Sequence, residues 1–101
     1  MYARVTTLES PPDRIDDATR FVQEQVLPQL QQMDGFKGFI ALGGRGSGKL
    51  LGVAFWENEE ALRATEEAAA RIRGGVAEAT GGAAMVTGAE NYEVAIFEVS
   101  S

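Results

Sequence analysis

The sequence contains no cysteine and no histidine among its 101 residues. Without cysteine the chain cannot form a disulfide, a thiolate nucleophile, a zinc finger or an iron–sulfur cluster. Without histidine it lacks a Ser-His-Asp triad, an imidazole metal ligand and a side chain whose unperturbed pKa lies near neutrality. These absences exclude the commonest nucleophilic and metal-dependent mechanisms.

Basic residues are also scarce. Nine Lys and Arg stand against 15 Asp and Glu, which gives a formal charge of −6, and the basic residues are scattered from Arg4 to Arg73. Each phosphate contact needs a basic side chain, and an acidic surface repels a polyanion. We therefore expect neither nucleic acid nor an anionic membrane surface as a partner.

Long apolar runs are missing as well. Residues 1–7 lack the run of about 7–15 apolar residues that a signal peptide requires, and no stretch approaches the roughly 20 residues of a membrane span. The absence of cysteine fits a reducing compartment, so we predict a cytoplasmic protein. With 45% hydrophobic residues the chain is apolar enough to fold, and its length predicts a single domain over residues 1–101.

The hydrophobic pattern predicts the element order βαββαβ. β-Branched and alternating apolar residues favour strands, and apolar residues at three- and four-residue steps favour amphipathic helices. This order is that of a ferredoxin-like, or split-βαβ, α+β fold with a four-stranded antiparallel sheet. The predicted strands are residues 2–9, 36–43, 49–57 and 90–99, and the predicted helices are residues 11–34 and 58–73.

Caps and helix breakers set the predicted helix ends. Ser10 is expected to cap the first helix, and Pro28 inside that helix predicts a kink because proline has no amide hydrogen to donate. Asn58 is a competent N-cap for the second helix, which Gly74-Gly75 are expected to stop or break. The Gly- and Ala-rich residues 74–89 otherwise allow only a short helical turn and a short extended piece.

Both faces of the predicted sheet are apolar through its middle, while two helices can cover only one face. Leaving five or six large apolar side chains in water forfeits on the order of 10 kcal/mol, at roughly 1.5–3 kcal/mol each. We therefore expect a homodimer whose sheets pack face to face; the alternative is a monomer with more exposed apolar surface. Because side chains alternate along a strand, each predicted strand divides into two sets that face opposite sides of the sheet. One set is Leu51, Val53, Phe55, Phe36, Ile40, Leu42, Tyr92, Val94 and Ile96. The other set is Leu50, Gly52, Ala54, Trp56, Phe39, Ala41, Ala95, Phe97 and Val99.

The glycine-rich loop and the clustered carboxylates carry no chemistry by themselves. Residues 43–49, GGRGSGK, match the start of a phosphate-binding loop, but Leu50 stands where a hydroxyl is needed and a strand follows, so we interpret them as a hairpin loop. Side chains of consecutive helical residues point about 100° apart, so the carboxylates near the second helix do not converge on a metal. We interpret them as a solvated surface; they are Glu57, Glu59, Glu60, Glu66 and Glu67.

The junction between the third strand and second helix, Phe55-Trp56-Glu57-Asn58-Glu59-Glu60-Ala61-Leu62, resembles the antibiotic biosynthesis monooxygenase family. Gly35-Phe36 and Pro28 are also similar to that family. The resemblance implies a dimeric α+β barrel. Its relatives include oxygenases, haem-degrading enzymes and proteins without assigned activity.

The resemblance implies different chemistry in different relatives. In haem-degrading members, the tryptophan, histidine and asparagine used for haem fall at Thr65, Gly75 and Thr6 or Thr7 here, so we expect no haem degradation. Cofactor-free, quinone-forming members share only the tryptophan, at Trp56; their asparagine and tyrosine fall at Gly52 and Leu62. We predict no metal and no cofactor, with a loosely bound flavin left open.

Trp56 has small neighbours on its predicted strand face. These neighbours either leave a cavity for a flat apolar ligand or let Trp56 fill the core. We take Trp56, Tyr92 and Arg71 as candidate ligand-binding residues. Two functions remain open: a cofactor-independent monooxygenase acting on a small aromatic or polyketide-like compound, and a non-catalytic ligand-binding or stress-associated barrel.

Overall fold

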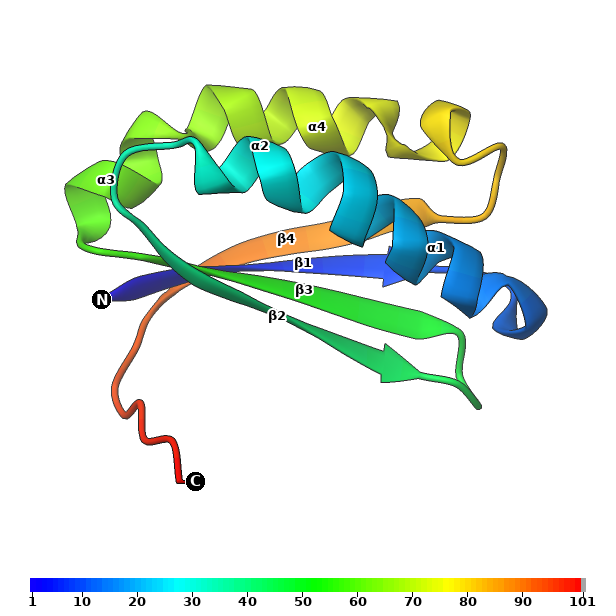
Figure 1. Ribbon diagram of the computed structural model, residues 1–101, viewed down its shortest axis with the longest axis horizontal. Helices are drawn as coiled ribbons and strands as arrows, with labels where there is room; N and C mark the ends of the chain where they lie inside the picture. The colour runs from blue at the N-terminus through cyan, green and yellow to red at the C-terminus, as the bar shows by residue number, and fades with distance from the viewer. Residues whose placement is uncertain (101) are drawn as a thin grey trace.

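The computed structural model describes residues 1–100, with four strands in one sheet and all helices on one face of it (Figure 1). The strands are β1 (Tyr2–Glu9), β2 (Phe36–Gly44), β3 (Lys49–Trp56) and β4 (Met85–Glu93). The helical segments are η1 (Pro12–Arg14), α1 (Ile15–Phe21), η2 (Val22–Val26), α2 (Leu27–Gln31), α3 (Glu59–Ala64) and α4 (Glu66–Ala79).

The sheet is antiparallel throughout, with the strand order β2-β3-β1-β4. The two central strands are therefore β1 and β3. The order βαββαβ, the fold class and the antiparallel sheet are confirmed. No helix within residues 1–100 has both the length and the apolar character needed to cross a bilayer.

The first helical layer, from η1 to α2, lays its predicted apolar stripe on the sheet, with Ile15, Val22 and Leu30 buried. The expected kink at Pro28 takes the form of a π-helical turn directly before it, where the Leu27 amide donates to the Val22 carbonyl five residues back. A π-turn redistributes the backbone hydrogen bonds that a proline interrupts. The predicted Ser10 cap is wrong: its hydroxyl donates to the Pro11 carbonyl at 3.1 Å, and the helical turn begins at Pro12.

The second helical layer begins as predicted, because the Asn58 side chain accepts a hydrogen bond from the Ala61 amide at 2.8 Å. A short break at Thr65 divides α3 from α4. The predicted stop at Gly74-Gly75 is wrong, since α4 continues through both glycines to Ala79. Each glycine costs a helix interior about 1 kcal/mol, and the burial of Ala69 before them and Val76 after them outweighs that cost.

The last strand lies nearer the N-terminus than predicted. β4 spans Met85–Glu93, while residues 94–100 leave the sheet without regular structure. The partner strand explains this end: Tyr2 pairs with Glu93, and the Val94 amide donates to the Met1 carbonyl, so β1 has nothing further to pair with. The predicted strand faces of Val94 to Val99 are therefore wrong.

A register shift in β2 corrects a second face assignment. Phe36 pairs with Trp56, but the next pair is Gly38 with Phe55, so the ladder skips Lys37. Such a bulge reverses the alternation on one side of it. Phe36 therefore lies on the helix-covered face, edge-to-face against Trp56 with ring centroids 5.6 Å apart, and not beside Ile40 as predicted.

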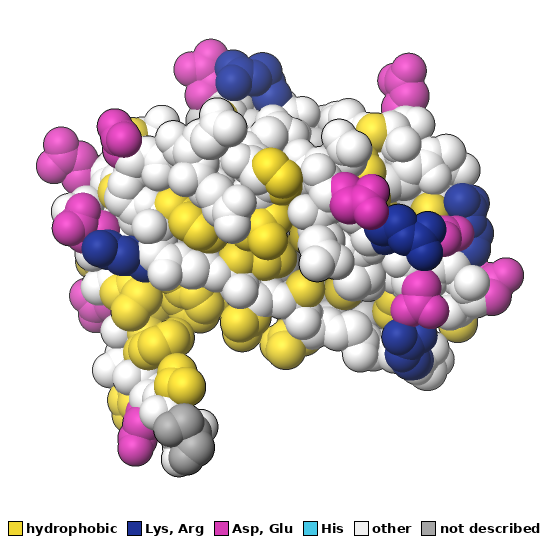
Figure 2. All heavy atoms as spheres, in the orientation of Figure 1, with side chains coloured by type: hydrophobic (Ala, Val, Ile, Leu, Met, Phe, Trp, Pro, Cys, Tyr) yellow, Lys and Arg dark blue, Asp and Glu magenta, His cyan; other side chains and the backbone are white. Residues whose placement is uncertain are grey.

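The core lies entirely between the sheet and the helices, where Trp56 and Leu50 are the largest fully buried side chains. The opposite face, here called the open face, carries no helix (Figure 1). Ile40 and Leu42 on it are 46% and 52% exposed. Figure 2 shows apolar side chains gathered along this lower rim of the molecule and on the C-terminal segment. The open face carries the apolar residues Ala3, Val5, Ile40, Leu42, Leu51, Val53, Phe55 and Tyr92, and also the polar residues Thr7, Glu9, Lys49 and Glu90.

The β2–β3 connection is a hairpin loop, as predicted. It runs through turns from Arg45 to Gly48 into β3, and no helix follows. Gly48 has φ +75°, and a Cβ atom there would collide with the Ser10 carbonyl oxygen. The Ser10 amide in turn donates to the Gly48 carbonyl at 2.7 Å. The glycine is thus needed for a tight turn, and the loop has no helix N-terminus with which to hold a phosphate.

Candidate functional site

A cavity of about 70 Å³ lies between the sheet and the two helical layers. At about 10–15 Å³ for each enclosed water, it has room for several water molecules or a small organic group. Its walls come from all four strands, from α1, η2 and α2 on one side and from α4 on the other. They are apolar except for Arg4, Thr6 and Arg73.

Small residues line this space while Trp56 fills the core, so the structure combines the two alternatives that the sequence left open. Gly52 and Ala54 form the floor on β3, and Ala69 stands opposite on α4. A Cβ atom at Gly52 would lie 3.3 Å from the ring of Phe39, so even one methyl group would push Phe39. Cavity size is therefore set by residues whose side chains are absent or a single carbon.

Arg4 extends from β1 under the helices and is 4% exposed. Its Nη2 donates to the Leu62 carbonyl at 2.9 Å and to Glu66 Oε2 at 2.8 Å, and its Nη1 donates to Thr65 Oγ1 at 3.2 Å. The break between α3 and α4 makes these acceptors available, because the Leu62 carbonyl lies at a helix end. The Arg4 Nε, also buried, has no hydrogen-bond partner.

Arg73 stands two helical turns after Glu66 on α4. Its Nη2 donates to Glu66 Oε1 at 3.4 Å, while its Nη1 is buried without a partner. Glu66 thus bridges the two arginines. Burial raises the pKa of the Glu66 carboxyl, but the charge and hydrogen bonds of Arg4, with those of Arg73, outweigh burial and leave the pKa below its ordinary value. Glu66 is therefore ionised at neutral pH.

The three residues predicted to bind a ligand are not brought together. Trp56 is fully buried and fills the core beside Leu30, Ala54 and Leu62, so it does not line the cavity. Tyr92 lies on the open face, 50% exposed, and donates to Glu90 Oε2 at 2.6 Å, which raises the pKa of its hydroxyl. Their role in binding stays a prediction.

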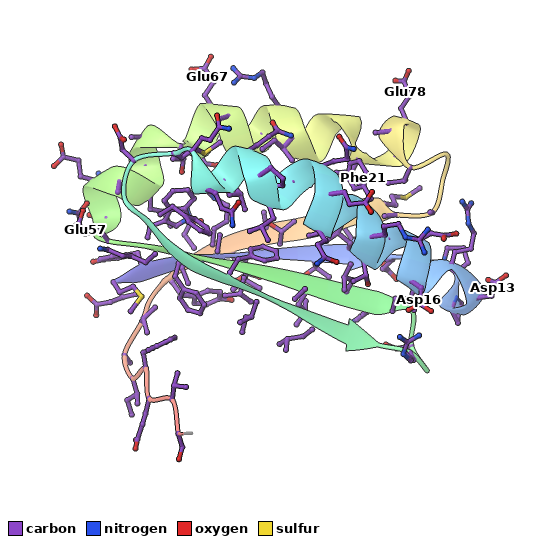
Figure 3. All side chains as sticks on the ribbon, in the orientation of Figure 1. Asp13, Asp16, Phe21, Glu57, Glu67 and Glu78 are labelled. Atoms are coloured by element: carbon purple, nitrogen blue, oxygen red, sulfur yellow. The ribbon has the colours of Figure 1, made fainter. Side chains whose placement is uncertain are left out.

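Arg71 is exposed on the outer side of α4, on a surface groove between the two helical layers. This groove and the cavity share three apolar residues, Phe21, Val26 and Ile72. Phe21 projects from the end of α1 (Figure 3). The groove and the cavity are thus neighbouring spaces, and Arg71 lines the groove but not the cavity.

Sequence reasoning missed Arg4 and Arg73, although the sequence carries a signal for each. Arg4 occupies an inward position of β1, on the same face as Leu8, because side chains alternate with a period of two. Arg73 lies four residues after the buried Ala69 and three before the buried Val76, within the inner stripe of the second helix. A cation at a predicted core position is the feature to look for.

Apart from Glu66, the acidic side chains lie away from Arg4 and Arg73. Figure 3 shows Glu67 and Glu78 pointing away from the sheet, and Asp13 and Asp16 at the far end of the molecule from Glu57. No group of three acidic residues within residues 1–100 converges as a metal site would require.

Haem does not fit these residues. The chain has no histidine to ligate iron, and Thr65 is buried in hydrogen bonds with Arg4 and the Leu62 carbonyl. The cavity of about 70 Å³ cannot admit a porphyrin without separating the helices from the sheet.

No model of a known protein family matches the sequence. Two uncharacterized proteins of Mycobacterium tuberculosis strain H37Rv, Rv2558 and Rv2557, are each 38% identical to this chain, over 96 and 95 residues. These alignments cover 95% and 94% of this chain. The chain spans only 39% and 41% of the length of these relatives.

Solved structures match along nearly the whole chain. A monooxygenase from Streptomyces coelicolor, ActVA-Orf6 in complex with nanaomycin D, has a TM-score of 0.69 at 18% identity, over 99% of this chain and 92% of that one. A putative antibiotic biosynthesis monooxygenase from Deinococcus radiodurans scores 0.67 at 15% identity, with full coverage of both chains. The haem-degrader MhuD of M. tuberculosis scores 0.67 at 22% identity, over 98% and 100%. The chain therefore has the ferredoxin-like fold of antibiotic biosynthesis monooxygenase-type proteins.

Proposed function

We propose that this chain binds a small, mostly apolar molecule in the cavity between sheet and helices. The cavity itself carries the proposal: it is apolar on nearly every side, with Arg4, Arg73 and Thr6 as its polar lining. Ligand sites in proteins commonly have this composition, with a few polar groups that fix orientation. A small aromatic or polyketide-like compound fits such walls.

The geometry favours binding over catalysis. Arginine stays protonated and donates without accepting, so neither Arg4 nor Arg73 can remove a proton from a substrate. Their partner Glu66 is held ionised by both arginines, which makes it a weak base. Thr6 is the remaining polar group on the walls, and a hydroxyl needs an adjacent base to act as a nucleophile.

Cofactor-independent oxygenation is the second candidate. It is favoured by the likeness in fold to the S. coelicolor monooxygenase and by the resemblance at Trp56. Here the substrate itself would supply the electrons to O₂, so the protein would need only to bind and orient it. Arg4 and Arg73 can stabilise a substrate anion without acting as bases.

Anthrone and a naphthohydroquinone are suitable probes for both candidates. Calorimetric titration of the full chain is expected to show saturable binding at one site per chain. Ala69→Leu fills the cavity and should abolish binding, whereas Ala70→Leu, an exposed neighbour, should not. Oxygen uptake above the buffer rate would favour the oxygenase, binding without uptake would favour the binding protein, and no binding of either probe would contradict both.

We further propose that two copies of the chain pair through the open face. Val5, Val53 and Ile40 lie side by side across three strands there, with no helix above them. The C-terminal segment covers only one end, where Phe97 packs edge-to-face on Phe55 at 5.3 Å. The sheet of a second copy packed on this face would bury its remaining apolar side chains. In a two-fold symmetric dimer, the same face of each copy forms the interface. The cytoplasmic location stays a prediction.

A further inference from the structure

We propose that the ligand of this cavity carries an anionic oxygen, a carboxylate or a phenolate, which Arg4 and Arg73 bind while its apolar part fills the remaining space. This inference rests on the proposed binding function and specifies its ligand class. The two arginines with Glu66 are called the polar wall below.

The charge of the polar wall is the first observation. Arg4 and Arg73 share one carboxylate, Glu66, whose two oxygens each receive one arginine. Glu66 itself lies behind the arginines, and no acidic residue among residues 1–100 lines the cavity. The polar wall therefore has one net positive charge beside an apolar space, where water screens charges poorly.

Unpartnered donors are the second observation. The Arg4 Nε and the Arg73 Nη1 are both buried without an acceptor, and both side chains line the cavity. Buried N–H groups are nearly always hydrogen-bonded in native proteins. Trp56 Nε1 is the third such donor among the described residues, but Trp56 does not line the cavity, so a ligand there would not reach it. Each of the two arginines that line the cavity thus has one donor without an acceptor.

Rigidity is the third observation. Three hydrogen bonds, to Leu62, Thr65 and Glu66, hold the Arg4 guanidinium, and the side chain is 4% exposed. A donor already fixed in place loses little conformational freedom when a ligand binds. Hydrogen bonds between charged partners are about twice as strong as those between neutral ones. An anionic oxygen is thus preferred over a neutral carbonyl of the same shape.

Benzoate and its neutral isostere benzamide form a matched pair of probes, and 4-nitrophenolate tests the phenolate source. We expect titration of the full chain to show benzoate or 4-nitrophenolate binding at least about tenfold more tightly than benzamide, the difference expected for one charge-assisted hydrogen bond. The probe that binds better identifies the source of the anion. Equal affinities for the charged and neutral probes would overturn the inference while leaving the binding function intact.

Arg73→Met removes one donor from the polar wall and keeps the aliphatic stem. We expect it to weaken anion binding about tenfold and benzamide binding less than about threefold, by the same hydrogen-bond argument. Arg63→Met, on the exposed surface of α3 and outside the cavity lining, is the control and should leave both affinities unchanged. Unchanged anion binding in a folded Arg73→Met variant would overturn the inference.

The protonation state of the probe provides a test in the wild-type chain alone, in case the variant does not fold. Lowering the pH until the anionic probe is protonated should weaken its binding and leave benzamide binding unchanged, because only the ionised ligand interacts with the net charge of the polar wall. An affinity for the probe that does not fall when the probe is protonated contradicts the inference. If neither benzoate, 4-nitrophenolate nor benzamide binds the wild-type chain, the binding function fails together with the inference.

Discussion

The two faces of this sheet are formed by alternating residues of the same strands, but they differ in composition and in what covers them. Along β3, Leu50, Gly52, Ala54 and Trp56 point toward the helices and are buried, while Leu51, Val53 and Phe55 alternate with them toward the open face. The helix-covered face contains a large aromatic, small residues and the buried Arg4. The open face is apolar through its middle, and its cation on the central strands, Lys49, lies at the end of β3 beside Glu9.

This difference indicates how the two faces are specialised. A face completed by its own helices can keep a cavity, because the surrounding core supplies enough burial to stabilise the fold around it. A face without helices depends on another surface for its burial, and uniform, medium-sized apolar residues suit flat packing of sheet on sheet. The comparison therefore agrees with the proposal that one side binds a ligand and the other pairs with a second copy.

Shortening the largest core side chain gives the largest expected effect. Trp56→Ala should destabilise the chain by about 3–5 kcal/mol, because the residue is fully buried. Leu42→Ala on the open face, where the side chain is 52% exposed, should cost less than about 1 kcal/mol in the monomer. Urea unfolding at low protein concentration measures both, and similar losses would show that the two faces do not differ as described.

The elements with strong periodic patterns were predictable from the sequence. The three first strands and the starts of both helical layers follow from alternation, from the three- and four-residue steps and from the Asn58 cap. The end of β4 was not predictable from the sequence. Residues 94–99 have the alternating pattern of a strand, but β1 begins at Tyr2, which pairs with Glu93, so the residues after Glu93 have no partner strand. The local hydrophobic pattern shows that a segment can form a strand, but a neighbouring strand must be present for it to pair.

Tertiary context also decided the interior details. Continuation of α4 through Gly74-Gly75 depends on the burial of Val76, which no helix propensity reports. The small residues left two outcomes open, a cavity or a core filled by Trp56. The structure has both, because the cavity lies beside Gly52 and Ala54 while the Trp56 ring packs against Phe36 after an unpredicted bulge. The inward position of Arg4 was visible in the alternation of β1, but its partners come from a helix break that the sequence did not predict.

A charge at the centre of the open face should separate the two copies. Val53→Asp places a carboxylate between Val5 and Ile40, where a buried unpartnered polar group costs about 1–3 kcal/mol per chain. Light scattering should then report a particle of one chain, with the circular dichroism of the fold retained. Thr87→Asp, an exposed position on β4, is the control. If the wild-type chain already scatters as a monomer of 10.8 kDa at micromolar concentration, pairing through the open face is wrong.

Replacing helical glycines should strengthen the layer that covers the cavity. A Cβ atom at Gly74 or Gly75 meets no atom within 4 Å, so each change to alanine should stabilise the chain by about 0.5–1 kcal/mol. Gly52→Ala is the opposing variant, because its Cβ would press on Phe39 inside the cavity. A rise in melting temperature for the first two and a fall for the third would sharpen the distinction between free and crowded positions. A loss of stability in Gly74→Ala would contradict the continuous helix.

The pH dependence of the unfolding free energy gives the smallest effect. It distinguishes an ion pair made by a buried arginine from a pair in which both side chains are exposed. The pKa of Glu66 is lowered in the folded chain, so its stabilisation is fully present above the unfolded pKa, near 4.5, and is lost as pH falls through the lower folded value. Because Glu66 is half exposed, we expect a difference between wild type and Glu66→Gln of about 1 kcal/mol or less near pH 6, closing toward pH 3. Urea unfolding at several pH values measures it.

Asp16 provides the comparison, since its hydrogen bond to Arg45 and the charge of that arginine also lower its pKa. Both Asp16 and Arg45 are exposed, whereas Arg4 is buried beside the cavity. At about 1 M salt, where charges are screened beyond about 3 Å, the pH-dependent difference for Asp16→Asn should vanish while that for Glu66→Gln persists. If salt abolishes both equally, Arg4 is as accessible to solvent as Arg45, and the polar wall does not face an enclosed apolar space.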